Sequence, residues 1–150
     1  MTSYGEVERE LAVLLRRARA WNRDVATEVH PDLQPAAYAL LSRVDELGAV
    51  RASDLSEYFG IDKGAISRQV QLLERTGLVA REPDPDDGRA QLLVVTGEGR
   101  KRLAQARDGR RRLVREQLDR WPESEVATFA ELLGRFNTQM DAALGREPGD

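Results

Sequence analysis

Polar and basic side chains between residues 63 and 71 have the chemistry needed to bind DNA. A helix expected over residues 63–76 turns Ile66, Val70 and Leu73 to its inner face, which leaves the opposite face for a ligand. Small residues at a helix start let a phosphate approach, and arginine and amide side chains donate to base edges. The candidate residues are Lys63, Gly64, Ala65, Ser67, Arg68, Gln69 and Gln71. The alternative is the solvated face of an ordinary amphipathic helix.

A second candidate for DNA contact is the polar segment over residues 82–89. Its sequence, EPDPDDGR, is rich in turn-forming residues and separates two β-type runs. Asp87 is expected to hold the guanidinium of Arg89 in one orientation, and an oriented arginine suits a narrow, electronegative minor groove. An ordinary surface turn is the alternative.

The residue types give little support to catalysis or metal binding. The chain has no cysteine, which removes disulfides, thiol nucleophiles and the usual zinc sites. Its one histidine, His30, lies on a different predicted element from Ser67 and is not positioned to act as the base for that hydroxyl. The sequence also contains no phosphate-binding glycine loop. We therefore expect no enzyme activity, no cofactor and no metal site.

Apolar side chains recurring every three and four residues predict helices, and one long polar turn predicts a β-hairpin. Pro35 suits a first helical position, Gly48 suits a helix end, and Asp62 and Thr96 suit N-caps. The helices are expected over 6–28, 35–48, 52–59, 63–76, 97–119 and 123–144, and the strands over 78–81 and 91–95. The predicted fold is mainly α with a small β-hairpin wing, a winged helix-turn-helix.

The net charge of −3 by itself argues against a nucleic-acid partner. The charges are segregated along the chain, however. Residues 99–120 carry nine Lys or Arg against three acids, whereas residues 121–150 carry six acids and two arginines. An acidic chain with this pattern has room for a basic face.

The chain resembles the MarR family of winged-helix transcription regulators over nearly its whole length. The resemblance is carried by LQPAAYALLSRV and by RASDLSEYFGIDKGAISRQVQLLERTGLVAREPDPDDGRAQLLVVTGEGRK, which contain the family's G-L-V-x-R-x-x-D-P-x-D-x-R wing followed by T-x-x-G. The matching residues are Gly77, Leu78, Val79, Arg81, Asp84, Pro85, Asp87, Arg89, Thr96 and Gly99. The resemblance implies that Arg89 enters the minor groove with support from Asp87, and that the segment 67–69 reads the major groove. Gly88 departs from the pattern, because the family often has a basic residue there.

The first and last predicted helices carry more apolar side chains than a small winged helix needs. On a single chain, Trp21, Trp121, Phe129 and Phe136 would contribute to exposed apolar patches. The resemblance implies a two-fold dimer through N- and C-terminal dimerisation helices. Such a homodimer would place two recognition helices about 34–36 Å apart, which matches a palindromic DNA site.

One MarR-type domain is expected over residues 1–150. Its DNA-binding lobe is expected over about 33–97, and its dimerisation helices over about 6–28 and 97–144. No apolar run reaches the ~18 residues needed to cross a bilayer, and the N-terminal residues lack a signal pattern. We therefore expect a cytoplasmic protein with no membrane partner.

The resemblance implies a sequence-specific regulator, and repression is the commoner outcome in the family. Family members usually respond to small, often phenolic or anionic ligands that bind between the lobe and the dimerisation helices. Arg17, Trp21, His30 and Tyr38 are candidates for such a site; the alternatives are core packing for Trp21 and Tyr38, and solvent exposure for His30. An alternative function is a winged-helix protein-interaction module without specific DNA binding, which the acidic balance and Gly88 favour.

Overall fold

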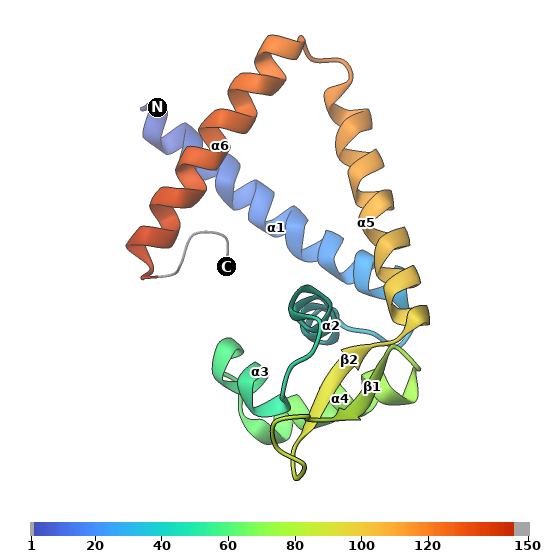
Figure 1. Cartoon of the computed structure of the whole chain (residues 1–150). Helices are drawn as coiled ribbons and strands as arrows, with labels where there is room; N and C mark the ends of the chain where they lie inside the picture. The colour runs from blue at the N-terminus through green and yellow to red at the C-terminus, as the bar shows by residue number, and fades with distance from the viewer. Residues whose placement is uncertain (1, 146–150) are drawn as a thin grey trace. The chain divides into compact units, whose positions relative to one another are not determined.

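The computed structural model describes residues 2–145, so Met1 and residues 146–150 of the predicted domain lie outside the described residues. Within this range, six helices and two strands follow in the predicted order (Figure 1). The helices are α1 (Ser3–Val29), α2 (Pro35–Leu47), α3 (Ala52–Phe59), α4 (Lys63–Arg75), α5 (Gly97–Leu118) and α6 (Glu123–Ala143), and the strands are β1 (Val79–Pro83) and β2 (Gln91–Val95). The chain divides into two units after Gly109, within α5.

The unit formed by residues 2–109 is built around one apolar core. Ile66, Val70 and Leu73, the predicted inner face of α4, are each 1% exposed. They belong to a cluster that takes buried side chains from α1, α2, α3, the hairpin and the start of α5. Burying one large aliphatic side chain contributes roughly 1.5–3 kcal/mol, so this cluster fixes α4 firmly against the rest of the unit.

The end of α1 is joined to this core and to α5. The buried residues of α1, Val25, Ala26 and Val29, all lie in its last five positions. His30 ends the helix, and its backbone N–H donates to a carbonyl one turn earlier. Arg102 of α5 donates to the carbonyl of Val29 at 2.9 Å. Arg102 thus places a cation at a helix end whose own last turn has no basic residue.

The two strands form the predicted antiparallel hairpin, with Pro83 opposite Gln91 at the loop end. β1 is therefore longer than predicted, because proline is tolerated at a strand end where no ladder hydrogen bond is needed. Val50, in the connection between α2 and α3, forms an isolated bridge with Leu93 of β2. The connection between the two helices thus lies directly beside the hairpin (Figure 1).

Thr96 caps α5, as predicted, and also joins this helix to the end of α4. Its Oγ1 accepts from the N–H of Gly99 at 3.0 Å and donates to the carbonyl of Gly77 at 2.6 Å. A Cβ atom added to Gly99 would lie 2.3 Å from the carbonyl oxygen of Leu78 and 2.7 Å from Cγ1 of Val95. Only glycine fits at this position, because backbone occupies the space that a side chain would need.

Apolar side chains remain exposed on α6, which belongs to the second unit, and on the N-terminal part of α1. Phe129, Leu132 and Met140 on α6, and Trp121 just before it, are each between 42% and 48% exposed, and α6 contributes no buried residue. On α1, the exposed apolar side chains include Tyr4, Val7, Leu14 and Leu15. Within residues 2–145, no helix is both long enough and apolar enough to cross a membrane.

Candidate nucleic-acid interface

α4 presents most of the predicted polar face beside its N-terminus. The exposed residues are Lys63, Gly64, Ser67, Arg68 and Gln71. Oδ2 of Asp62 accepts from the N–H of Ala65 at 3.2 Å, which confirms the predicted N-cap. A Cβ atom on Gly64 would lie 3.0 Å from the same oxygen, so glycine keeps the cap uncrowded. Because the carboxylate already binds one of the first N–H groups, any ligand at this helix end would be contacted mainly by the exposed side chains.

Ala65 and Gln69 stand apart from this face because both are half-buried. Oε1 of Gln69 is buried and makes no hydrogen bond within the described residues. Residue 69 lies three and four positions from the core residues Ile66 and Leu73, which explains its turn toward the interior. Donation from Gln69 to a base edge would require its side chain to rotate, whereas Arg68 is already exposed. The role predicted for Gln69 stays a prediction.

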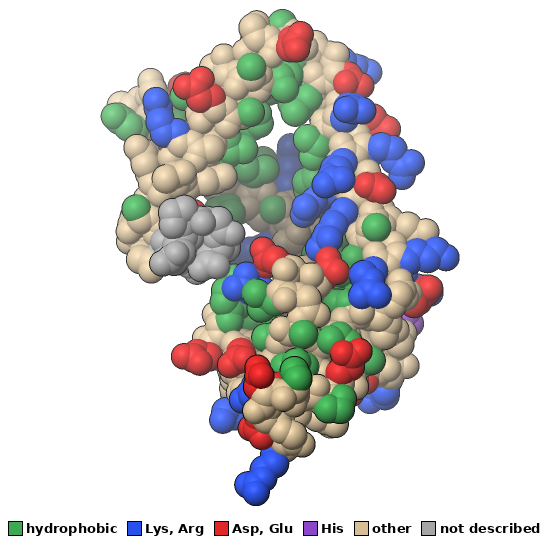
Figure 2. Space-filling view, in the orientation of Figure 1, with side chains coloured by type: hydrophobic (Ala, Val, Ile, Leu, Met, Phe, Trp, Pro, Cys, Tyr) green, Lys and Arg blue, Asp and Glu red, His purple; other side chains and the backbone are tan. Residues whose placement is uncertain are grey.

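The loop between β1 and β2 carries Arg89, which is exposed. Figure 2 shows a basic side chain projecting from the loop end of the hairpin. Oδ1 of Asp87 accepts from the backbone N–H of Arg89 at 3.1 Å. The observed contact is therefore with the backbone, whereas the sequence predicted a contact with the guanidinium. An aspartate two residues before an N–H closes an Asx turn, so Asp87 orders the loop backbone and leaves the Arg89 side chain in solvent.

An ion pair at the base of this loop was missed by the sequence reasoning. Asp84 is only 6% exposed, and its Oδ2 accepts from Nε of Arg51 at 2.8 Å and also from Nη2. A hydrogen bond from the backbone N–H of Asp86, together with Arg51, holds the pKa of the Asp84 carboxyl below its ordinary value. Asp84 in turn raises the pKa of Arg51. The partners are 33 positions apart, and no local pattern in the sequence links them.

Basic side chains also gather along α5 (Figure 2). Three of them make contacts within the first unit. Arg100 donates to the carbonyl of Val95, Arg102 donates to the carbonyl of Val29, and Arg107 donates to Asp45. The basic excess of residues 99–120 therefore serves partly to hold α5 in place.

The residues predicted for effector binding occupy different environments. Arg17 is exposed on α1, whereas Trp21 and Tyr38 are half-buried against the core, as the alternative of core packing expects. The side chain of His30 is 24% exposed, and its Nδ1 accepts from the N–H of Asp32. Solvent exposure, the alternative for His30, is therefore wrong, because this residue is the half-buried C-cap of α1.

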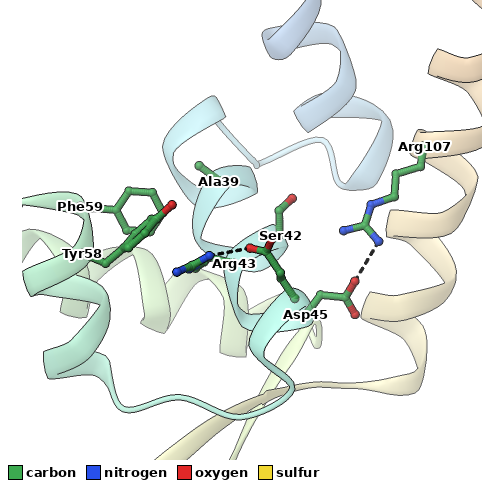
Figure 3. Close-up of a pocket in the computed structure, with 8 residues that line it drawn as sticks. Ala39, Ser42, Arg43, Asp45, Tyr58, Phe59 and Arg107 are labelled. Carbon is green, nitrogen blue, oxygen red and sulfur yellow. Dashed lines mark hydrogen bonds and ion pairs between the residues drawn. The ribbon is translucent and has the colours of Figure 1, made fainter. Parts of the chain in front are cut away.

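A pocket of about 420 Å³ opens between α2, α3 and α5, and none of those four residues lines it (Figure 3). The guanidinium carbon of Arg43 lies 3.9 Å from the centroid of the Tyr58 ring, and Nη1 pairs with Glu46 at 2.8 Å. From α5, Arg107 donates to Asp45 at 2.9 Å. The lining thus holds two guanidinium groups and two carboxylates, and one of the guanidinium groups, that of Arg43, lies over an aromatic ring. In residues 2–145 no group of three or more His, Asp or Glu side chains could hold a metal ion.

Comparison with known sequences identifies the family. Residues 32–90 match the sequence model of the MarR family. The uncharacterized HTH-type transcriptional regulator YxaD of Bacillus subtilis is 34% identical over 131 residues, which cover 87% of this chain and 90% of YxaD. The chain belongs to the MarR family. This MarR-family protein is thus a transcription regulator with a DNA-binding winged-helix fold. In this fold α4 is the second helix of the helix-turn-helix, and the β1–β2 hairpin is the wing.

Solved structures share the fold at low sequence identity. RV1404 from Mycobacterium tuberculosis superimposes with a TM-score of 0.82 at 20% identity, covering 92% of this MarR-family chain and 94% of RV1404. FabT from Streptococcus pneumoniae, solved in complex with DNA, has a TM-score of 0.78 at 17% identity, with 94% and 99% of the two chains covered. These likenesses confirm the predicted winged-helix fold.

Proposed function

We propose that this MarR-family regulator binds a palindromic operator as a homodimer and represses transcription from it. The observation that carries the proposal is the exposure of Arg68 on α4 and of Arg89 on the wing of one lobe. A helix fits the major groove, and a thin hairpin can reach the neighbouring minor groove. Arg68 and Ser67 would read base edges, while Arg89 would enter the minor groove. The complex of FabT with DNA supports the same partner for this fold.

The homodimer would use the apolar faces of the long helices. Phe129 and Leu132 on α6, and Leu14 and Leu15 on α1, are more than 40% exposed, although burying such side chains is favourable. A two-fold interface over these faces would remove them from water. In this proposal residues 33–97 form the DNA-binding lobe, and residues 6–28 and 97–144 provide the dimerisation helices.

The test compares operator binding by Arg68→Ala and Arg89→Ala variants, using a duplex selected by the parent protein from a random pool. Loss of a good bidentate arginine–guanine pair costs about 1–3 kcal/mol, so Arg68→Ala should bind roughly 5- to 150-fold more weakly and accept more base changes. Arg89→Ala should also weaken binding, and its salt dependence should be shallower because fewer counterions are released. Fluorescence anisotropy across a salt series measures both effects.

Arg9→Ala is the matched control, because it removes the same charge from an exposed side chain of α1 that pairs with Glu10. This variant should bind like the parent. If the Arg68 and Arg89 variants also bind like the parent, the assigned contacts are incorrect. If the parent itself shows only weak binding that is independent of sequence, the protein-interaction module is the better description.

We further propose that an aromatic or anionic effector releases the operator by binding in the pocket beside Arg43 and Arg107. The pocket volume of about 420 Å³ lies within the range of small-molecule sites. An anionic ligand there would compete with Asp45 for Arg107 and with Glu46 for Arg43. To shift the protein away from DNA, the ligand must bind the DNA-incompetent dimer more tightly than the competent one.

Thermal-shift measurements with benzoate and hydroxybenzoates, paired with operator release, test the effector proposal. An active compound should raise the Tm of the parent and release the duplex, and Arg107→Ala should weaken both responses. Arg112→Ala is the control, because it removes an exposed arginine of the same helix that does not line the pocket. Stabilisation of the parent without any change in its DNA affinity would count against a sensing role.

A further inference from the structure

Asp84 connects the wing loop to the helical part of the lobe. It lies one residue beyond β1 and is 6% exposed, although it carries a charge. Its two carboxylate oxygens have different partners: Oδ2 accepts from Arg51, and Oδ1 accepts from the backbone N–H of Asp86 at 2.9 Å. A buried carboxylate needs hydrogen-bond partners for its oxygens, since an unpaired charge inside a protein is strongly destabilising.

Arg51 is held in place from the other side. It is the N-cap residue of α3, and its carbonyl accepts from the N–H groups of the first turn of that helix. The preceding residue, Val50, exchanges two backbone hydrogen bonds with Leu93 of β2, at 2.8 and 3.1 Å. The short connection between α2 and α3 therefore holds both arms of the hairpin. It binds β2 through Val50 and the end of β1 through the Arg51–Asp84 pair.

A continuous series of contacts leads from this pair to Arg89. The backbone N–H of Asp84 donates to the carbonyl of Ala90 at 3.1 Å, and the N–H of Ala90 donates to the carbonyl of Asp87 at 2.9 Å. Asp87 closes the loop by accepting from the N–H of Arg89. The backbone that carries Arg89 is thus fixed relative to the helices through the Asp84 carboxylate.

We propose that Arg51 and Asp84 are positioning residues for DNA binding, which hold the wing so that Arg89 meets the minor groove while α4 occupies the major groove. This inference rests on the proposed function, in which Arg89 contacts DNA. If the charge of Asp84 acted only by repelling the DNA phosphates, removing it would strengthen DNA binding. The positioning role predicts the opposite, namely weaker DNA binding when this charge is removed.

The decisive comparison is between Asp84→Asn and Asp86→Asn, measured on the selected operator duplex. Both substitutions remove one negative charge from the same loop, but only Asp84 pairs with Arg51. Asp84→Asn should weaken binding by on the order of tenfold, because a neutral acceptor holds a guanidinium less firmly than a carboxylate does. Asp86→Asn should bind as well as the parent or better. Equal or tighter binding by Asp84→Asn would overturn the proposal.

The double variant Asp84→Asn/Arg89→Ala shows whether Asp84 acts through Arg89. If it does, the double variant binds no more weakly than Arg89→Ala alone, because the positioned group is already absent. If the losses of DNA affinity from the two substitutions add up, the proposal is overturned, since Asp84 would then affect binding independently of Arg89. Arg51→Gln gives the same comparison in the Arg89→Ala background if Asp84→Asn does not fold.

Amide hydrogen exchange in the free protein separates this inference from the proposed function. The N–H groups of Asp86 and Ala90 should exchange faster in Asp84→Asn than in the parent, while the amides of α4 remain unchanged. This result is expected even if the parent binds no duplex specifically, an outcome that would count against the proposed function alone. Unchanged exchange at both loop amides would overturn the positioning role.

Discussion

The charged residues of the unit formed by residues 2–109 fall into two groups. Arg68 and Arg89 extend into solvent and are available to a polyanion. Arg51, Arg102 and Arg107 are instead bound to a carboxylate or a carbonyl, and they hold elements together. Net charge therefore says little about DNA binding in this protein, because the acids and bases that pair internally cancel without affecting the exposed face.

The Asp84–Arg51 pair should make folding stability depend on acid pH. The pKa of Asp84 lies below the ordinary aspartate value of about 3.9, so its ionised form stabilises the fold fully above that value. This contribution is lost as the pH falls through the lower pKa of the folded state. Asp84→Asn should therefore be less stable than the parent at pH 7, and the difference should shrink below about pH 4. Urea denaturation at several pH values measures this dependence.

Asp86→Asn controls for the change in loop charge, because Asp86 makes no ion pair with Arg51. It should follow the parent at every pH. A stability gap for Asp84→Asn that stayed constant from pH 7 to pH 3 would contradict the assigned source of the stabilisation.

The burial or exposure of a single side chain was predictable from the sequence where helical periodicity assigns it to a face, as it does for Ile66 and Arg68 on α4. The partner of Asp84 was not predictable, because periodicity describes neighbours on one element and Arg51 is 33 positions away. The same holds for Arg107 and Asp45, which are 62 positions apart. The pocket beside them was missed for this reason.

At the scale of elements, the junction between the hairpin and α5 depends on close backbone contact. Thr96 and Gly99 correspond to the T-x-x-G pattern in the sequence, and the structure supplies its physical reason. The threonine hydroxyl bridges Gly77 and Gly99, and the absence of a Cβ on Gly99 lets the helix approach Leu78.

Gly99→Ala should therefore destabilise the protein. The new methyl group would lie 2.3 Å from the carbonyl oxygen of Leu78, so either the helix or the strand must move. Overpacking of this kind costs about 1–3 kcal/mol, which exceeds the gain of roughly 0.5–1 kcal/mol from replacing glycine in a helix. The shift in the midpoint of urea unfolding measures the loss.

Gly109→Ala is the matched control in the same helix. Its new methyl group would lie 3.7 Å from Oε2 of Glu28, which is an ordinary contact distance. This variant should be as stable as the parent, or more stable by up to about 1 kcal/mol. Equal stability of the two alanine variants would contradict the claim that close backbone contact at Gly99 leaves no room for a side chain.

Element boundaries agreed with the predictions to within a few residues, and the differences have local causes. α1 begins earlier than predicted because Thr2 caps it, with Oγ1 accepting from the N–H of Gly5 at 3.4 Å. β1 extends to Pro83, which the sequence assigned to the loop. Propensity alone does not reveal such ends, since a single cap or strand pairing decides them.

At the scale of the whole molecule, the exposed apolar side chains of α6 are the main unexplained feature of a single chain. The rings of Trp121 and Phe129 lie 5.8 Å apart and line a hollow of about 390 Å³ together with Leu132. An interface core of aromatic and aliphatic groups is typical of homodimers. The proposed homodimer would also present two copies of α4 to one duplex.

Phe129→Glu should convert the protein to a monomer, because burying an unpaired carboxylate at an apolar interface is costly. Sedimentation velocity should show this change, while circular dichroism stays close to that of the parent. Ala127→Glu is the control, since it adds the same charge at an exposed position outside the hollow. A Phe129→Glu protein that still sedimented as a dimer would place the interface elsewhere.

Selection of bound sequences from a random duplex pool is the most direct test of paired DNA recognition. The enriched sequences should contain two inverted half-sites with centres about 10–10.5 base pairs apart, or a multiple of that spacing, and each duplex should bind two chains. No enriched sequence, or a single half-site occupied by one chain, would contradict recognition by two copies of α4 and the wing.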